Sequence, residues 1–162
     1  VRLDAEFLQA FGVAVVDAPD VADDVRRGVA QRVVAEEPRA HIHARETEAL
    51  RHEARVIALV PCCQAEVSRL LDEAKGPLHQ LWRHPIQRRE FGAHVTNVIR
   101  GLVLEAHGYK VRVTELTGLE HSLKNELIVA ERHQRSNAQA RGELERLIGQ
   151  LGVRPALLDV MN

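Results

Sequence analysis

The chain has 162 residues, of which 45% are hydrophobic and 3% are aromatic, so it can bury one core built mainly of aliphatic side chains. A formal net charge of −1 excludes a strong overall field that would attract nucleic acid or an anionic membrane, but it leaves room for a local basic surface. No apolar run is long enough to span a bilayer, and the N-terminal residues carry acids where a signal peptide would be apolar. We therefore expect a soluble, cytoplasmic domain without a membrane partner.

The N-terminal third carries weak patterns. Residues 11–17 form a short apolar run that predicts a strand, and valines at every fourth position over 21–33 predict an amphipathic helix. Residues 41–44 are interpreted as the remnant of a strand. On such a strand His41 and His43 would point the same way, so a metal site there is a minor alternative to ordinary histidines.

From Arg55 onward the periodicities are sharper. The predicted strands are 56–60, 109–116 and 125–130, and the predicted helices are 67–74, 91–106 and 136–151. Gly108 is placed to end the second helix, and Ser136 with Gln139 forms a capping box for the third. This order of strands and helices is typical of the second half of a doubly wound α/β domain.

Basic residues and the single tryptophan lie in and after a proline-containing surface segment, 77–87. The basic residues are Arg83, His84, Arg88, Arg89 and Arg100. They could guide a nucleic-acid backbone, but a solvated helix face is the preferred interpretation. Trp82 is expected to anchor its segment rather than to stack on a base.

Pro61, Cys62 and Cys63 follow the apolar strand 56–60. In open α/β sheets ligands bind beyond the carboxyl ends of the strands, so these residues could line a pocket. The alternatives are that the cysteines are small buried hydrophobic residues or, less favoured, a zinc ligand pair or a catalytic thiolate. Because the two cysteines are adjacent, they cannot form a disulfide that links distant segments of the chain.

Four chemically different groups lie just before the strand 125–130. Glu120, His121, Lys124 and Asn125 supply a carboxylate, an imidazole, an ammonium and an amide. Glu120 or His121 could act as a general base, and Lys124 could hold an anionic group such as phosphate. The alternative is structural, with Glu120 and Lys124 as an ion pair that fixes the loop and Asn125 as a cap for backbone groups.

Four stretches together resemble one family of class I, S-adenosylmethionine-dependent methyltransferases, which includes relatives of RNA methyltransferases. They are VIALVPCCQAE (56–66), LEAHGY (104–109), VTEL (113–116) and EHSLKNELIVA (120–130). The resemblance runs from about Arg55 to Leu151. It implies a Rossmann-like doubly wound sheet, here incomplete. In this sheet the predicted strands 56–60, 109–116 and 125–130 are the fifth, the sixth and an antiparallel seventh.

The resemblance also implies S-adenosylmethionine as the cofactor and, by family analogy, RNA as the methyl acceptor. It places Pro61, Cys62, Cys63, Lys124 and Asn125 at the acceptor-binding site, with Glu120 and His121 as the catalytic residues. Because the fifth and seventh strands are neighbours in this fold, Lys124 and Asn125 are expected close to Cys62 and Cys63.

The upstream part departs from the family pattern. The chain contains no Gly-x-Gly, so the tight loop that brings backbone close to the cofactor is missing, and 41–45 keeps only the His-Ala of the family's fourth-strand motif. We divide the chain into an atypical or truncated N-terminal part, 1–54, and the C-terminal half of the methyltransferase-like domain, 55–162. The alternative function is a non-catalytic α/β interaction module. It would be either a degenerate methyltransferase or a methyltransferase fragment that pairs through the exposed edge of its truncated sheet, for example as a homodimer.

Overall fold

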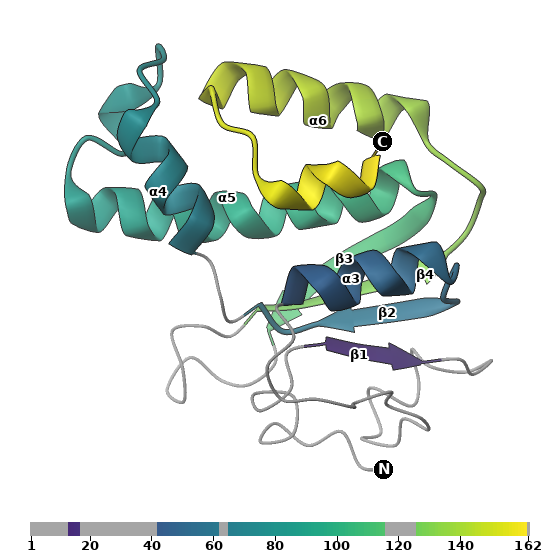
Figure 1. Ribbon diagram of the computed structural model, residues 1–162. Helices are drawn as coiled ribbons and strands as arrows, with labels where there is room; N and C mark the ends of the chain where they lie inside the picture. The colour runs from purple at the N-terminus through teal and green to yellow at the C-terminus, as the bar shows by residue number, and fades with distance from the viewer. Residues whose placement is uncertain (1–12, 17–41, 62–64, 116–125, 162) are drawn as a thin grey trace. The chain divides into compact units, whose positions relative to one another are not determined.

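The computed structural model describes residues 13–16, 42–61, 65–115 and 126–161, which form a mixed α/β structure (Figure 1). The elements in chain order are β1 (Val13–Val16), α3 (Ile42–Arg51), β2 (Val56–Leu59), α4 (Ala65–Glu73), the 3-10 helix η1 (His79–Leu81), α5 (Pro85–Ala106), β3 (Tyr109–Glu115), β4 (Glu126–Arg132), α6 (Ala138–Leu151) and the 3-10 helix η2 (Ala156–Met161). The described residues of Val1–Cys62 and Tyr109–His133 form a sheet unit, and those of Cys63–Gly108 and Gln134–Asn162 form a helical unit.

The four described strands of the sheet unit are arranged in the order β1-β2-β4-β3, and each neighbouring pair is antiparallel. Strand β4 pairs with β3 from Tyr109↔Arg132 to Glu115↔Glu126 and with β2 from Val56↔Glu131 to Leu59↔Ile128. The predicted strands are thus confirmed as members of one sheet, and the last strand is antiparallel to both neighbours, as expected. Strands β2 and β3 therefore run in the same direction on either side of β4.

The centre of the sheet is buried because its strands are rich in aliphatic and β-branched residues. All four residues of β2 are buried, and in β4 the side chains of Ile128 and Ala130 are fully inaccessible. Strand β3, at the end of the sheet, exposes Lys110, Arg112 and Thr114. Burial thus falls from the inner strands to the edge strand.

In the helical unit, the long helix α5 packs against both α4 and α6. The centre of its predicted apolar stripe is confirmed, because Val95, Ile99, Val103 and Ala106 are all buried at helical spacing. The stripe was also expected to include Val98, which is exposed, and Phe91 and Leu102, which are half-buried. Gly108 follows the helix with a positive φ of 88°, which a glycine adopts without strain, and its amide donates to the carbonyl of Glu105 at 2.8 Å. None of the described helices is long and apolar enough to cross a membrane.

Two local predictions are wrong, and one lies outside the described residues. The supposed strand at 41–44 is replaced by helix α3, which begins at Ile42 and buries Glu46, Ala49 and Leu50 at helical spacing. The capping box is also absent, because Asn137 is the N-cap of α6 and its side chain accepts from the amide of Ala140 at 3.1 Å. The helix predicted over 21–33 lies outside the described residues.

Close contact between α4 and α5 depends on a glycine. A Cβ at Gly92 would lie 2.7 Å from Cα of Ser68, whereas a Cβ at Gly142 in α6 would meet no atom within 4 Å. We expect Gly92→Ala to lower the free energy of unfolding by roughly 1–3 kcal/mol through overpacking. The control Gly142→Ala should raise it by roughly 0.5–1 kcal/mol, because alanine favours the helix. Urea denaturation of both variants measures the free energy of unfolding. An equal change for the two variants would contradict the close contact between α4 and α5 at Gly92.

Candidate functional site

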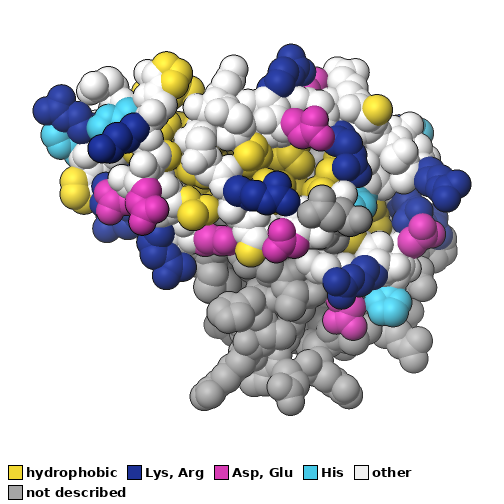
Figure 2. All heavy atoms as spheres, turned by 45° about the horizontal axis from the view of Figure 1, so that its top comes forward, with side chains coloured by type: hydrophobic (Ala, Val, Ile, Leu, Met, Phe, Trp, Pro, Cys, Tyr) yellow, Lys and Arg dark blue, Asp and Glu magenta, His cyan; other side chains and the backbone are white. Residues whose placement is uncertain are grey.

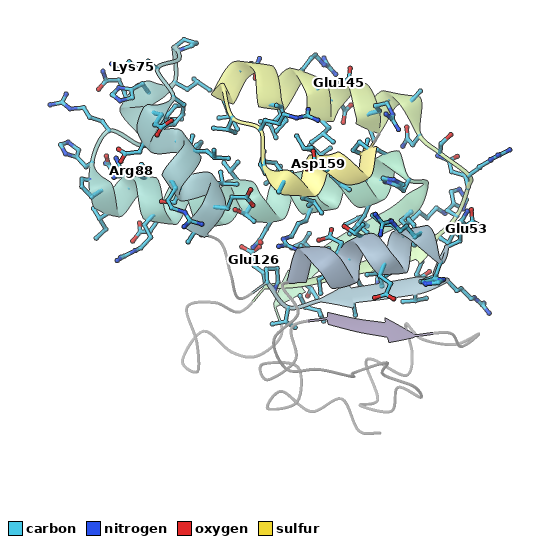
Figure 3. The ribbon with its side chains drawn as sticks, viewed as in Figure 1. Glu53, Lys75, Arg88, Glu126, Glu145 and Asp159 are labelled. Atoms are coloured by element: carbon cyan, nitrogen blue, oxygen red, sulfur yellow. The ribbon has the colours of Figure 1, made fainter. Side chains whose placement is uncertain are left out.

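One edge of the sheet brings together the strand ends that flank both predicted motifs. Strands β2 and β3 end there and β4 begins there, since Leu59 lies opposite Ile128 and Glu115 lies opposite Glu126. The Pro-Cys-Cys motif follows β2 directly in the sequence, and the Glu-His-x-x-Lys-Asn motif lies between β3 and β4. We call this the motif edge of the sheet; Glu126 lies at it, and Glu53 lies at the opposite end of the sheet unit (Figure 3).

Of the predicted site residues, the structure describes only Pro61, which is buried. Its position fits the predicted end of the strand, because β2 stops at Leu59 and proline cannot donate a ladder hydrogen bond. The remaining six, Cys62, Cys63, Glu120, His121, Lys124 and Asn125, lie outside the described residues. The pairing of β2 with β4, on which their expected proximity depends, is present in the sheet.

Glu126 is a residue at the motif edge that the sequence analysis did not single out. It is the first residue of β4, it is half-buried, and it makes a polar or electrostatic interaction. Its place directly after Asn125 was the available signal. A carboxylate at this edge can accept hydrogen bonds or balance a positive charge.

The opposite end of the sheet is held by a hydrogen-bonded group around the buried side chain of Tyr109. The Tyr109 hydroxyl donates to the carbonyl of Ala54 at 2.7 Å, and Nη2 of Arg132 lies 2.9 Å from Oε1 of Glu53. Arg132 is also hydrogen-bonded to the Tyr109 side chain. These contacts fix the turn between α3 and β2 to the ends of β3 and β4, so this group has a structural role.

Burial raises the pKa of the Tyr109 hydroxyl above its usual value, and the charge of Glu53 raises it further. The hydrogen bond and the charge of Arg132 act in the opposite direction but do not cancel the effect of burial. Tyr109 therefore remains a protonated hydrogen-bond donor at neutral pH and is unsuited to act as a base.

The basic residues in and after the segment 77–87 lie in different environments. Arg83, His84 and Arg89 are exposed, whereas Arg88 forms an ion pair with Asp72 of α4. Arg100 is fully buried and takes part in a polar or electrostatic interaction, so its assignment to this surface was wrong. Figure 2 shows Lys and Arg side chains dispersed among Asp and Glu, which favours a solvated surface.

Trp82 has the anchoring role that the sequence analysis preferred. Only 1% of it is exposed, its Nε1 donates to the carbonyl of Ala74 at 3.4 Å, and its ring stacks on Phe91 with the centroids 5.4 Å apart. The indole fixes the segment between α4 and α5 by burial and stacking, and its face is not open to a nucleic-acid base.

The metal site considered for His41 and His43 and the comparisons with known proteins both gave negative results. Among the residues that the structure describes, no group of three or more His, Cys, Asp or Glu side chains could hold a metal ion. The strand on which His41 and His43 were to face the same way is replaced by α3, which contains His43. No protein-family model, curated protein or solved structure matches the chain.

Tyr109 is the only tyrosine in the chain, so phenolate absorbance reports on this group alone. We expect its titration midpoint in the folded protein to lie above the usual value of about 10, and to return to that value in denaturant. Because the folded-state pKa is raised, the corresponding stability is complete below about pH 10 and is lost as the pH rises through the folded-state pKa.

The matching variant is Tyr109→Phe. It should lower the free energy of unfolding at neutral pH by roughly 1–2 kcal/mol, since the hydrogen bonds of the hydroxyl to the Ala54 carbonyl and to Arg132 are lost, and it should remove this alkaline dependence. The same midpoint in folded and denatured protein would contradict the assignment.

Proposed function

We propose that this chain is the C-terminal half of an S-adenosylmethionine-dependent methyltransferase with an incomplete Rossmann-like sheet. The observation that carries the proposal is the strand order β2-β4-β3, with β4 antiparallel to both neighbours. This is the arrangement that the resemblance implies for the fifth, seventh and sixth strands. The pairing of β3 with β4 alone says little about the family, because strands adjacent in the chain often pair as hairpins. The position of β4 between β2 and β3 is a more specific point of agreement with the family.

The proposed chemistry belongs to the motif edge. The methyl donor is already an electrophilic sulfonium, so the protein needs to orient the acceptor and, for some acceptors, to remove a proton. Glu120 or His121 would take the proton, and Lys124 would hold an anionic part of the acceptor. Pro61, Cys62, Cys63 and Asn125 would line the acceptor site.

RNA is the proposed acceptor, and this part rests on family analogy. The exposed side chains of Arg83, His84 and Arg89 are compatible with contacts to phosphates. On the face drawn in Figure 2, Lys and Arg side chains are dispersed among Asp and Glu, so this face offers few such contacts. Binding of RNA should therefore depend on the motif edge more than on a general basic surface.

A second candidate is a non-catalytic interaction module, and one observation favours it. Strand β1 pairs antiparallel with β2, whereas a doubly wound sheet would have a parallel strand beside the fifth. Together with the lack of any Gly-x-Gly, this pairing means that the N-terminal part does not follow the cofactor-binding half of the resembled family.

Isothermal titration with S-adenosylmethionine and S-adenosylhomocysteine separates the two candidates, with ATP as the control ligand. The methyltransferase proposal predicts that both cofactor forms bind with a micromolar dissociation constant, about −8 kcal/mol, and that ATP does not. Absence of heat with either cofactor form at millimolar ligand would contradict the proposal for this chain and favour the interaction module.

A further inference from the structure

Strand β3 is an edge strand whose seven residues pair only with β4 among the described strands. The outer side of such a strand presents backbone N–H and C=O groups that another extended segment can bind. The strand is also exposed, since Val113 has 54% of its surface accessible and Lys110, Arg112 and Thr114 are exposed as well. This outer side is called the β3 edge.

The side chains of the β3 edge alternate in chemistry because successive residues of a strand point to opposite faces. Lys110, Arg112 and Thr114 share one face, and Val111 and Val113 share the other. Across the sheet, Lys110 lies opposite Glu131, but Arg112 lies opposite the uncharged Val129. The charge of Arg112 is therefore not balanced by its cross-strand neighbour.

A second copy of the chain fits this edge poorly. The symmetric antiparallel register that pairs all seven residues is centred on Arg112, and it places Arg112 opposite Arg112 of the other copy. A register centred on Val111 places Lys110 opposite Arg112. Like charges at opposed positions destabilise a strand pair, so the basic residues disfavour self-association in these two registers. A register centred on Val113 would place Arg112 opposite Thr114 but would pair only five of the seven residues.

We propose that the β3 edge binds an extended, acidic segment of a partner protein. Acidic residues of that segment lie opposite Lys110 and Arg112, and β-branched residues lie opposite Val111 and Val113. The backbone supplies the hydrogen bonds, and the alternating charge selects the partner. This inference does not depend on the proposed methyltransferase activity, and it stands or falls separately from cofactor binding.

The probe is the peptide acetyl-TVEVET-amide, with acetyl-TVKVKT-amide as the matched control. Amide hydrogen exchange of the full chain, measured by NMR, distinguishes the β3 amides that point away from β4 from those already paired. We expect the glutamate peptide to slow exchange of the outward-pointing amides and the lysine peptide to leave them unchanged. Equal protection by both peptides, or no protection at millimolar peptide, would overturn the proposal.

A charge reversal tests the selectivity. Arg112→Glu should weaken binding of the glutamate peptide by about tenfold and allow the lysine peptide to bind. Arg146→Glu, an exposed change on α6, is the matched control and should alter neither peptide's binding. Unchanged exchange of the β2 amides verifies that both variants keep the sheet.

Other occupants give distinct results. Protection of the β3 amides that grows with protein concentration, without peptide, would assign the edge to a second copy. Protection of the same amides by an oligouridylate would assign it to nucleic acid. Either result would overturn the proposal of an acidic partner strand.

Discussion

The sheet unit depends on β4, which has hydrogen-bonded neighbours on both sides. Among the described strands, β2 and β3 belong to one sheet only because β4 lies between them. Its backbone groups are paired in both directions, and burying a large aliphatic side chain such as Ile128 contributes roughly 1.5–3 kcal/mol. Because β4 is antiparallel to both neighbours, it begins at the edge where they end, and this places the flanks of the two motifs together.

Sequence periodicity predicted the strands and the longer helices from residue 56 onward because most of their buried positions are apolar. It placed the start of α5 at residue 91 instead of Pro85, and it did not predict η1 or η2. It fails at α3, because the buried positions of this helix include a glutamate, Glu46, so the apolar helical stripe is incomplete. The four-residue alternation at 41–44 then predicts a strand. The capping error has a different cause. Ser136 and Asn137 can both cap a helix, and only the backbone conformation decides between them.

The functional prediction depended on the resemblance to a family, because contacts between residues far apart in the chain leave no local pattern in the sequence. The pairing of β2 with β4 joins residues about seventy positions apart, and the hydrogen bond from Tyr109 to Ala54 spans 55 positions, so neither has a local signal. By contrast, the burial of Arg100 could have been predicted, because it lies three residues before Val103 and one after Ile99 on the apolar stripe of α5. A charged residue on such a stripe was assigned to the surface by its chemistry alone.

The most direct test of the account concerns the meeting of the two motifs at one sheet edge. The chain has only three lysines, Lys75, Lys110 and Lys124, and its two cysteines are Cys62 and Cys63. Lys110 lies in register with Glu131 and Val56, at the far end of the sheet from Leu59, so it is an internal control. A short amine-to-thiol cross-linker, mapped by mass spectrometry, should join the cysteines to Lys124 and not to Lys110. Cross-links to Lys110 without any to Lys124 would contradict the shared edge.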